Sequence, residues 1–148
     1  MTATAAWGAT SPDSGVNPMT IERRSLRADD VDIETHYRGV CHSDLHQARN
    51  DWGNSAYPVV PGHEIVGTVV ARGASVTRFA VGNRVGVPWL GGTCRSCTYC
   101  NTGRENLCDQ PTFTGYTRDG GYAERCAADA RFAFAILPGF DDDVAAPL

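Results

Sequence analysis

Four closely spaced cysteines place the strongest constraint on what this chain can fold into. Cys94, Cys97, Cys100 and Cys108 follow the spacing C-x2-C-x2-C-x7-C. Between residues 93 and 108 Cys, Gly, Thr and Asn dominate, and aliphatic residues nearly vanish. Such a segment buries too little apolar surface to offset the conformational entropy lost on folding, so a cross-link must organise it.

Zinc fits this spacing. Thiolates three residues apart on a tight turn converge on one ion, and a fourth after a short loop closes a tetrahedron of sulfurs about 2.3 Å from the metal. Four thiolates leave no open coordination position, which is typical of a structural site. An iron–sulfur cluster, a pair of disulfides, or unpaired thiols are the alternatives. A reducing compartment favours zinc over disulfides.

The N-terminal region and the lack of a long apolar run indicate a reducing, cytoplasmic compartment. Residues 1–15 are rich in Ala, Thr and Ser and lack the basic and apolar regions of a signal peptide. No run of eighteen apolar residues occurs, so we expect a cytoplasmic protein without a membrane partner.

The net charge is -4, and all thirteen basic residues are arginines. This balance argues against a nucleic-acid partner and a nucleic-acid-binding zinc ribbon. We expect arginines such as Arg23, Arg72 and Arg131 on solvated faces.

Short apolar runs between turn residues predict a mostly β domain with short helices. At 148 residues the chain fits one domain. After a loose start, we expect a short helix over 44–49 with Ser43 as its cap, and an acidic helix start at 141–143. The predicted strands cover residues 21–26, 32–40, 65–71, 81–87, 120–126 and 131–136. Together they suggest a compact, mostly β barrel.

A second cluster of metal-ligand residues lies in two segments, 41–46 and 61–64. Cys41 offers a soft thiolate and His63 an imidazole. A catalytic zinc takes three protein ligands and keeps one position open. Glu64 is a further weak ligand or a carboxylate beside the ligands, and Asp44 is a candidate for orienting one of them. Taken singly, Cys41 also fits a small buried apolar residue, and His63 a structural histidine.

Three motifs together resemble the zinc-containing medium-chain alcohol dehydrogenases. Residues 62–67, followed by Gly73 and Val76, match the family's zinc signature; residues 39–46 match its first catalytic-zinc segment; and the cysteine spacing matches its structural zinc lobe. The first half is most similar to cinnamyl-alcohol dehydrogenases, and the second to bacterial primary-alcohol dehydrogenases. The resemblance implies a GroES-like, partly open β-barrel spanning residues 1–148, with a zinc lobe at about 91–111.

The resemblance also assigns roles to individual residues. It implies a catalytic zinc on Cys41, His63 and a third ligand, usually a cysteine just beyond the position of Leu148, with Glu64 able to move onto the metal. Ser43 and His46 resemble the proton relay, and His42 lies where relatives contact the cofactor pyrophosphate. Trp52 and Trp89 resemble substrate-pocket walls, although both also fit ordinary core aromatics.

The implied activity is oxidation of primary alcohols to aldehydes, or the reverse, with NAD or NADP. The chain contains no G-x-G-x-x-G fingerprint, so we expect the nicotinamide-binding Rossmann domain to be absent and the isolated chain to be inactive. A small alcohol or aldehyde is the expected substrate, and a homodimer or homotetramer is expected for the full protein. The alternative is a non-catalytic zinc-binding β domain, either an engineered or a truncated fragment. A zinc-free quinone-reductase-like relative is disfavoured by the presence of Cys41, His63 and Glu64.

Overall fold

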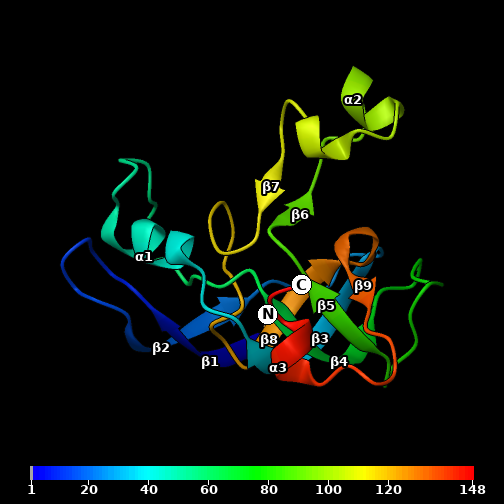
Figure 1. The fold of residues 1–148 in the computed structure, drawn as a ribbon, viewed down its shortest axis with the longest axis horizontal. Helices are drawn as coiled ribbons and strands as arrows, with labels where there is room; N and C mark the ends of the chain where they lie inside the picture. The colour runs from blue at the N-terminus through cyan, green and yellow to red at the C-terminus, as the bar shows by residue number, and fades with distance from the viewer. Residues whose placement is uncertain (1) are drawn as a thin grey trace.

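A five-stranded antiparallel sheet forms the body of the domain. The computed structural model describes residues 2–148, and the sheet order is β8-β3-β4-β5-β9 (Figure 1). The strands are β3 (Asp30–Arg38), β4 (Ile65–Arg72), β5 (Arg84–Val87), β8 (Arg125–Asp129) and β9 (Phe134–Ala135). The sheet curves without closing, which confirms the prediction of a mostly β, GroES-like, partly open barrel.

Alternating side chains of these strands build the main core. Val31 and Ile33 of β3 are fully buried, as are Val69 of β4 and Val85 of β5. In a strand successive side chains point to opposite faces, so this alternation places one face of the sheet in the interior. The strands at 65–71 and 81–87 were predicted from β-branched residues such as Val69 and Val85, which form this core.

The N-terminal segment is a strand, so the expectation of a loose start was wrong. β1 (Thr2–Gly8) pairs antiparallel with β2 (Asn17–Arg23) along its whole length. Its other edge is also bonded, since the Trp7 amide donates to the Tyr122 carbonyl at 2.7 Å. Alanine and threonine alternate over residues 2–5 and Trp7 is the one large apolar residue of the strand, so the sequence signal for a strand is weak.

Helix α1 (His42–Arg49) begins two residues earlier than the predicted helix at 44–49. The N-cap is Cys41, not Ser43, and the Asp44 carboxylate accepts a hydrogen bond of 3.0 Å from the Cys41 amide. This bond satisfies an amide that the helix itself cannot. The helix ends at Asn50, whose φ of 59° lies in the left-handed region that asparagine tolerates.

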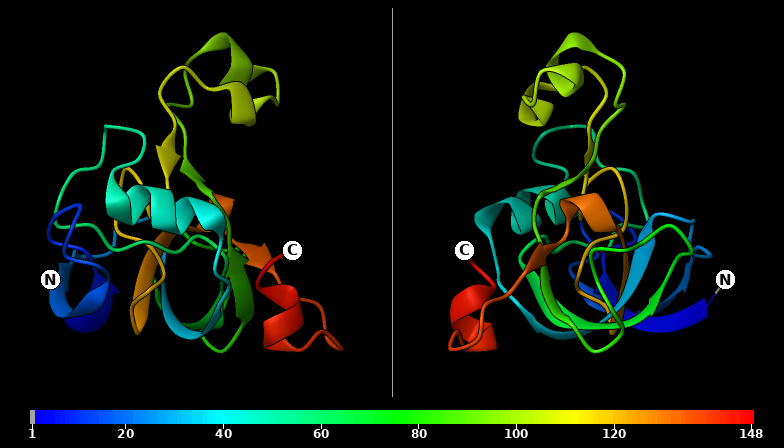
Figure 2. Two further views of the ribbon diagram at one scale, coloured as in Figure 1. Left: turned by 60° about the vertical axis from the view of Figure 1, so that its left-hand side comes forward. Right: turned by 90° about the vertical axis from the view of Figure 1, so that its right-hand side faces the viewer.

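The four-cysteine lobe stands away from the sheet (Figures 1 and 2). It is carried by β6 (Leu90–Gly92) and β7 (Thr112–Phe113), which pair antiparallel, and it holds helix α2 (Thr98–Asn101) and a 3-10 turn (Glu105–Leu107). The buried clusters of the described residues lie almost entirely outside it, with Cys108 its one deeply buried side chain. The lobe therefore depends on its cysteines rather than on apolar packing.

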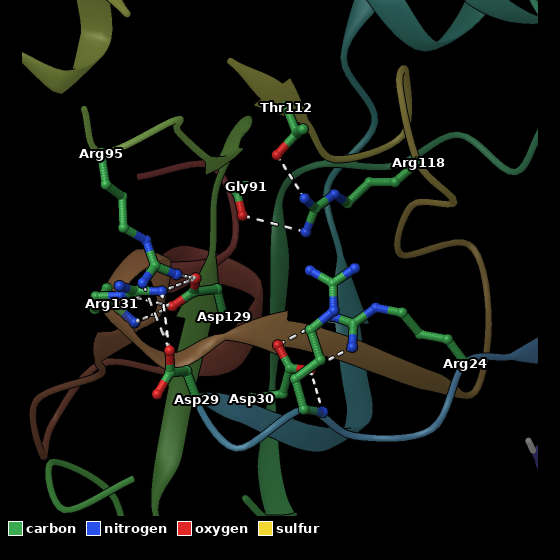
Figure 3. Close-up of polar contacts among 10 residues, drawn as sticks. Arg24, Asp29, Asp30, Gly91, Arg95, Thr112, Arg118, Asp129 and Arg131 are labelled. Atoms are coloured by element: carbon green, nitrogen blue, oxygen red, sulfur yellow. Dashed lines mark hydrogen bonds and ion pairs between the residues drawn. The ribbon is translucent and has the colours of Figure 1, made fainter. Parts of the chain in front are cut away.

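Charged side chains attach the base of the lobe to the sheet (Figure 3). Arg95 contacts Asp129 at 3.0 Å and Asp29 at 3.6 Å, and Arg131 pairs with the same two carboxylates.

Arg23 does not lie on a solvated face as expected. It is buried and donates to the Arg125 carbonyl at 2.9 Å and the Gly120 carbonyl at 2.7 Å.

The C-terminal third differs from the prediction at its strand boundaries. The strand expected at 120–126 begins only at Arg125, because residues 120–122 bond to the segment 60–62 instead of extending a ladder. The strand expected at 131–136 is a 3-10 turn (Ala130–Phe132) followed by the short β9. The acidic start leads into helix α3 (Asp142–Ala145) as expected.

Between residues 2 and 148, no helix has the length and apolar character required to span a bilayer.

Candidate metal and substrate site

The pairing of β3 with β4 brings the two ligand segments together. Arg38 at the end of β3 faces Ile65 at the start of β4, and the Gly39 amide extends the ladder by donating to the Glu64 carbonyl at 2.8 Å. Cys41 follows this pair on one strand, and His63 precedes it on the other. Donor atoms of Cys41, His63 and Glu64 consequently lie within 4.8 Å of one another.

Ser43 lies between the two ligand side chains. Its hydroxyl donates to the Cys41 sulfur at 3.1 Å and lies 3.4 Å from Nε2 of His63. The hydroxyl and backbone amide of Ser43, acting against partial desolvation, hold the pKa of the Cys41 thiol below its ordinary value. A thiol biased toward thiolate is a better metal donor.

Asp44 is a buried carboxylate that joins both ligand segments. Besides the Cys41 amide, it accepts from the Gly62 amide at 2.9 Å and from the Tyr122 hydroxyl at 3.0 Å. Nδ1 of His63 lies 3.3 Å from Oδ1 of Asp44, at ion-pair distance but outside the geometry of a well-formed hydrogen bond. Burial alone would lower the pKa of His63, yet the Asp44 carboxylate outweighs it and raises that pKa. Desolvation opposes ionisation of Asp44 itself, and its hydrogen bonds nevertheless lower its pKa.

The side chain of Glu64 occupies space that Gly39 leaves free. A Cβ added at Gly39 would lie 1.8 Å from a carboxylate oxygen of Glu64 and 2.9 Å from its Cβ. No side chain larger than hydrogen fits there without displacing Glu64. Gly39 thus fixes where the Glu64 carboxylate can lie, a role that the motif alone did not reveal.

His42, expected to contact the cofactor, and His46, expected in the proton relay, lie along one face of α1. The rings of His42 and His46 are 4.7 Å apart, and the His46 ring is 5.3 Å from that of Trp52. Nδ1 of His46 contacts the Asp51 carboxylate at 2.7 Å. These contacts hold His46 at the surface, whereas Ser43 lies at the Cys41–His63 pair.

The two tryptophans differ in their distance from the ligands. Trp89 meets the His63 ring edge-on at 5.0 Å and stacks on Phe113 at 4.7 Å and Tyr116 at 5.6 Å. Trp52 is 46% exposed and reaches this group through Tyr116, whose ring it meets edge-on at 6.1 Å. Phe113 and Tyr116 had no predicted role, because a lone aromatic in a loop carries no pattern.

A cavity of about 650 Å³ opens beside the ligands. His63, Glu64 and Trp89 line one side, and apolar residues of β5, β9 and the C-terminal segment line the remainder. Trp52 is not among the lining residues. The cavity has the size and the mix of many apolar and few polar groups that small-molecule sites share.

The four-cysteine lobe has the dimensions of a single-ion site. All four sulfurs lie within 4.8 Å of one another, with Cys94–Cys100 at 3.9 Å and Cys97–Cys100 at 3.6 Å. A tetrahedron with metal–sulfur bonds of about 2.3 Å has edges of roughly 3.8 Å. No disulfide forms, since all six cysteines are free. Arg95 adopts a φ of 61°, which turns the chain tightly between Cys94 and Cys97.

The lobe thiols influence one another strongly. Backbone amides of Ser96 and Cys97 lower the pKa of the Cys94 thiol to about 6. Thr93 lowers the pKa of Cys100, but desolvation and the neighbouring Cys97 and Cys108 sulfurs outweigh it and raise the pKa to about 11. Four sulfurs this close cannot all ionise without a cation between them, so the donor set fits a divalent metal.

Comparison with known proteins places these features in one family. The profile described as "Alcohol dehydrogenase GroES-like domain" matches residues 27–138. A probable cinnamyl alcohol dehydrogenase 8B of Oryza sativa subsp. japonica is 40% identical over 99% of this chain and 35% of that protein. A cinnamyl alcohol dehydrogenase structure from Sorghum bicolor matches with a TM-score of 0.93 and 35% identity, over 99% of this chain and 44% of that one. The structure of CAD from Helicobacter pylori, complexed with NADP(H), matches with a TM-score of 0.92 and 28% identity, over 98% of this chain and 44% of that one.

The chain spans less than half the length of these relatives. The profile match covers most of the chain, including both ligand segments and the lobe, and the relatives are alcohol dehydrogenases. The chain therefore belongs to the zinc-containing medium-chain alcohol dehydrogenase family, as a GroES-like domain.

Proposed function

We propose that this chain is the substrate-activating domain of an NAD(P)-linked alcohol dehydrogenase that interconverts primary alcohols and aldehydes. The observation that carries the proposal is the convergence of donor atoms of Cys41, His63 and Glu64 within 4.8 Å of one another, with His63 and Glu64 lining a cavity of about 650 Å³. A soft thiolate, an imidazole and a carboxylate at one point suit a metal that keeps a position open for a substrate oxygen.

Two metal sites follow from the donor sets. Cys41 and His63 would hold the catalytic zinc, with Glu64 as an exchangeable ligand, and the four lobe cysteines would hold a structural zinc. A bound catalytic zinc supplies Lewis acidity, which lowers the pKa of an alcohol hydroxyl.

The chain's own residues would move the proton. The Ser43 hydroxyl lies within 3.4 Å of both ligand side chains, so it can accept a proton released at the cavity wall. His46 lies at the surface and can exchange a proton with water. His42, on the same helix, would meet the cofactor pyrophosphate. The hydride acceptor, NAD or NADP, is supported by the NADP(H) complex of the Helicobacter pylori relative.

The cavity wall favours alcohols with an apolar or aromatic substituent. Trp89 presents its ring beside His63, and the remaining lining is almost wholly apolar. The relatives named as cinnamyl alcohol dehydrogenases support an aromatic primary alcohol as the first substrate to test. Trp52 would contribute only through Tyr116, at the outer edge of the aromatic group.

The organisation that accompanies this function is that of a two-domain enzyme. We infer that residues 1–148 form the catalytic domain with the lobe at about 91–111, and that a separate Rossmann domain binds the cofactor. A cytoplasmic location and a homodimeric or homotetrameric full protein complete the proposal.

The test compares the purified chain with the longer protein that carries it. The chain alone should bind zinc but show no NAD(P)-linked oxidation of cinnamyl alcohol, whereas the longer protein should be active. In the longer protein His63→Ala should abolish turnover while the lobe retains its zinc, measured by metal analysis. Full activity of the His63→Ala protein would contradict the proposal, and an inactive unchanged longer protein that still binds zinc would favour a zinc-binding β domain without catalysis.

A further inference from the structure

Tyr122 makes a polar contact that lies behind the metal ligands rather than at the cavity. Its hydroxyl is 3.0 Å from Oδ2 of Asp44, the same oxygen that accepts from the Cys41 amide. The other oxygen of Asp44 faces the Gly62 amide and Nδ1 of His63. Asp44 is 4% exposed, so every donor that it has matters to where its carboxylate lies.

The ring of Tyr122 is held firmly enough to aim this hydroxyl. Its backbone amide donates to the Pro61 carbonyl at 3.0 Å. A Cβ placed on Gly62 would lie 2.6 Å from Cδ1 of the ring, so the ring packs directly against the backbone that precedes His63. Ala6, Val60 and Ala123 complete its apolar surroundings. A fixed ring gives the hydroxyl one direction, toward Asp44.

We propose that Tyr122 is a positioning residue: its hydroxyl holds the Asp44 carboxylate in the orientation that directs Nε2 of His63 toward Cys41 and the metal. The inference rests on the proposed function, because it concerns the same ligand pair. Without the phenol, Oδ2 of Asp44 keeps the Cys41 amide alone, and the carboxylate can rotate away from Nδ1 of His63. Partners of a ligating histidine set its ring orientation and its strength as a ligand.

The phenol stays protonated throughout the range in which the protein would work. Burial and the adjacent Asp44 charge raise the pKa of Tyr122 above its ordinary value. The residue is therefore a permanent donor to Asp44 and takes no part in proton transfer. This separates it from Ser43 and His46, whose proposed roles require exchange of a proton.

The test is a cobalt titration of four proteins: the unchanged chain, Tyr122→Phe, Asp44→Asn and the double variant. Co²⁺ replaces zinc at both sites, and its absorption distinguishes four thiolates from a site with one thiolate. The four-thiolate band serves as an internal control for folding. Tyr57→Phe is the matched control variant, since the Tyr57 hydroxyl donates to the Ala48 carbonyl at 2.7 Å, away from the ligands.

We expect Tyr122→Phe to weaken cobalt binding at Cys41 and His63 by roughly tenfold, the lower end for loss of an outer partner of a ligand. The four-thiolate band and Tyr57→Phe should be unaffected. In the Asp44→Asn background the Tyr122→Phe change should have no further effect, because residues that act through one another are not additive. If Tyr122→Phe lowers cobalt affinity equally in both backgrounds, or in neither, the inference is overturned. The proposed metal set of Cys41 and His63 would be unaffected by that outcome. Failure of the unchanged chain to bind cobalt outside the lobe would overturn the proposed metal set, and this inference with it.

Discussion

The hydroxyl of Ser43 donates a hydrogen bond of 3.1 Å to the sulfur of Cys41. The bond links a residue proposed to carry protons to a residue proposed to hold the metal. The Ser43 hydroxyl therefore affects the reactivity of the Cys41 thiol, and this reactivity can be measured before any metal is added.

Ser43→Ala should make Cys41 less reactive in the metal-free chain. Loss of the hydrogen bond removes the main influence that lowers the pKa of Cys41, so less thiolate forms near neutral pH. At about 1 kcal/mol for the bond, alkylation at pH 7 should slow roughly fivefold. Iodoacetamide labelling followed by mass spectrometry measures the rate at Cys41, and Cys126 gives the unreactive reference because it is fully buried. An unchanged rate would show that the hydroxyl does not stabilise the thiolate.

Removal of zinc should unfold the lobe and leave the sheet intact. The lobe has almost no apolar core, so its order depends on the metal. The chain has no lysine, so trypsin cuts only at arginine, and Arg104 is exposed between α2 and the 3-10 turn. Chelation, or Cys97→Ser, should accelerate cleavage after Arg104 at least tenfold in a peptide map. Cleavage after Arg72, exposed at the end of β4, should change little. Equal acceleration at both sites would mean that the whole domain depends on the metal.

Asp30→Asn should destabilise the fold by roughly 2 kcal/mol at neutral pH. Asp30 is buried and accepts two hydrogen bonds from Arg24 and one from the Arg27 amide (Figure 3). Removing one partner of a buried pair costs about 3–5 kcal/mol, reduced here because the Arg24 side chain is 34% exposed. Urea unfolding in the presence of chelator measures the difference. The matched control is Asp32→Asn, because the Asp32 side chain is 21% exposed against 3% for Asp30, and its cost should stay below about 1 kcal/mol.

The same pair sets a pH dependence with a definite sign. Burial alone would raise the pKa of Asp30, but the bonds from Arg24 and Arg27 outweigh it and lower that pKa below 3.8. A depressed pKa in the folded state stabilises the protein above the unfolded value and loses this contribution as pH falls through the folded one. The stability gap between the unchanged chain and Asp30→Asn should thus be constant above about pH 5 and close toward pH 3. A gap that widened in acid would contradict the assignment.

Gly39→Ala should displace Glu64 and destabilise the domain by about 1–3 kcal/mol, the usual cost of overfilling a packed site. Truncation of the obstructing carboxylate should relieve much of this cost, so Gly39→Ala should be milder in a Glu64→Ala background. Thermal unfolding of the four proteins gives the coupling energy. Additive losses would show that the clash with Glu64 is not the cause.

Local patterns predicted several strands of the sheet and the four-cysteine lobe, whereas the metal role of Cys41, His63 and Glu64 came from resemblance and remains a prediction. β4 was predicted because Ile65, Val66 and Val69 carry a strong β signal, and the lobe because its cysteines repeat at short spacing. β1 was missed because a strand of Ala and Thr is stabilised by partners far along the chain, such as Tyr122.

Contacts over long sequence separations also decided the details of the site. Ser43 was predicted as a helix cap from residue type, but Asp44 reaches back to the Cys41 amide and moves the start of α1. No pattern connects Tyr122 to Asp44, or Gly39 to Glu64, because each contact is created by the tertiary fold and not by spacing. The roles of Ser43, His46 and Trp52 came from resemblance and remain predictions.

The ladder between β3 and β4 contains two register shifts, and the second lies near the metal ligands. Thr35 faces Gly67 and Tyr37 faces Val66, so His36 is an extra residue opposite a single step of β4. Because His36 is the unpaired residue, its deletion would leave Thr35 opposite Gly67 and Tyr37 opposite Val66 and would remove only the local bend and extra twist that a bulge gives a strand. The bulge therefore affects the direction in which the chain leaves β3 toward Cys41, whereas the pairing of Arg38 with Ile65 keeps Cys41 beside His63.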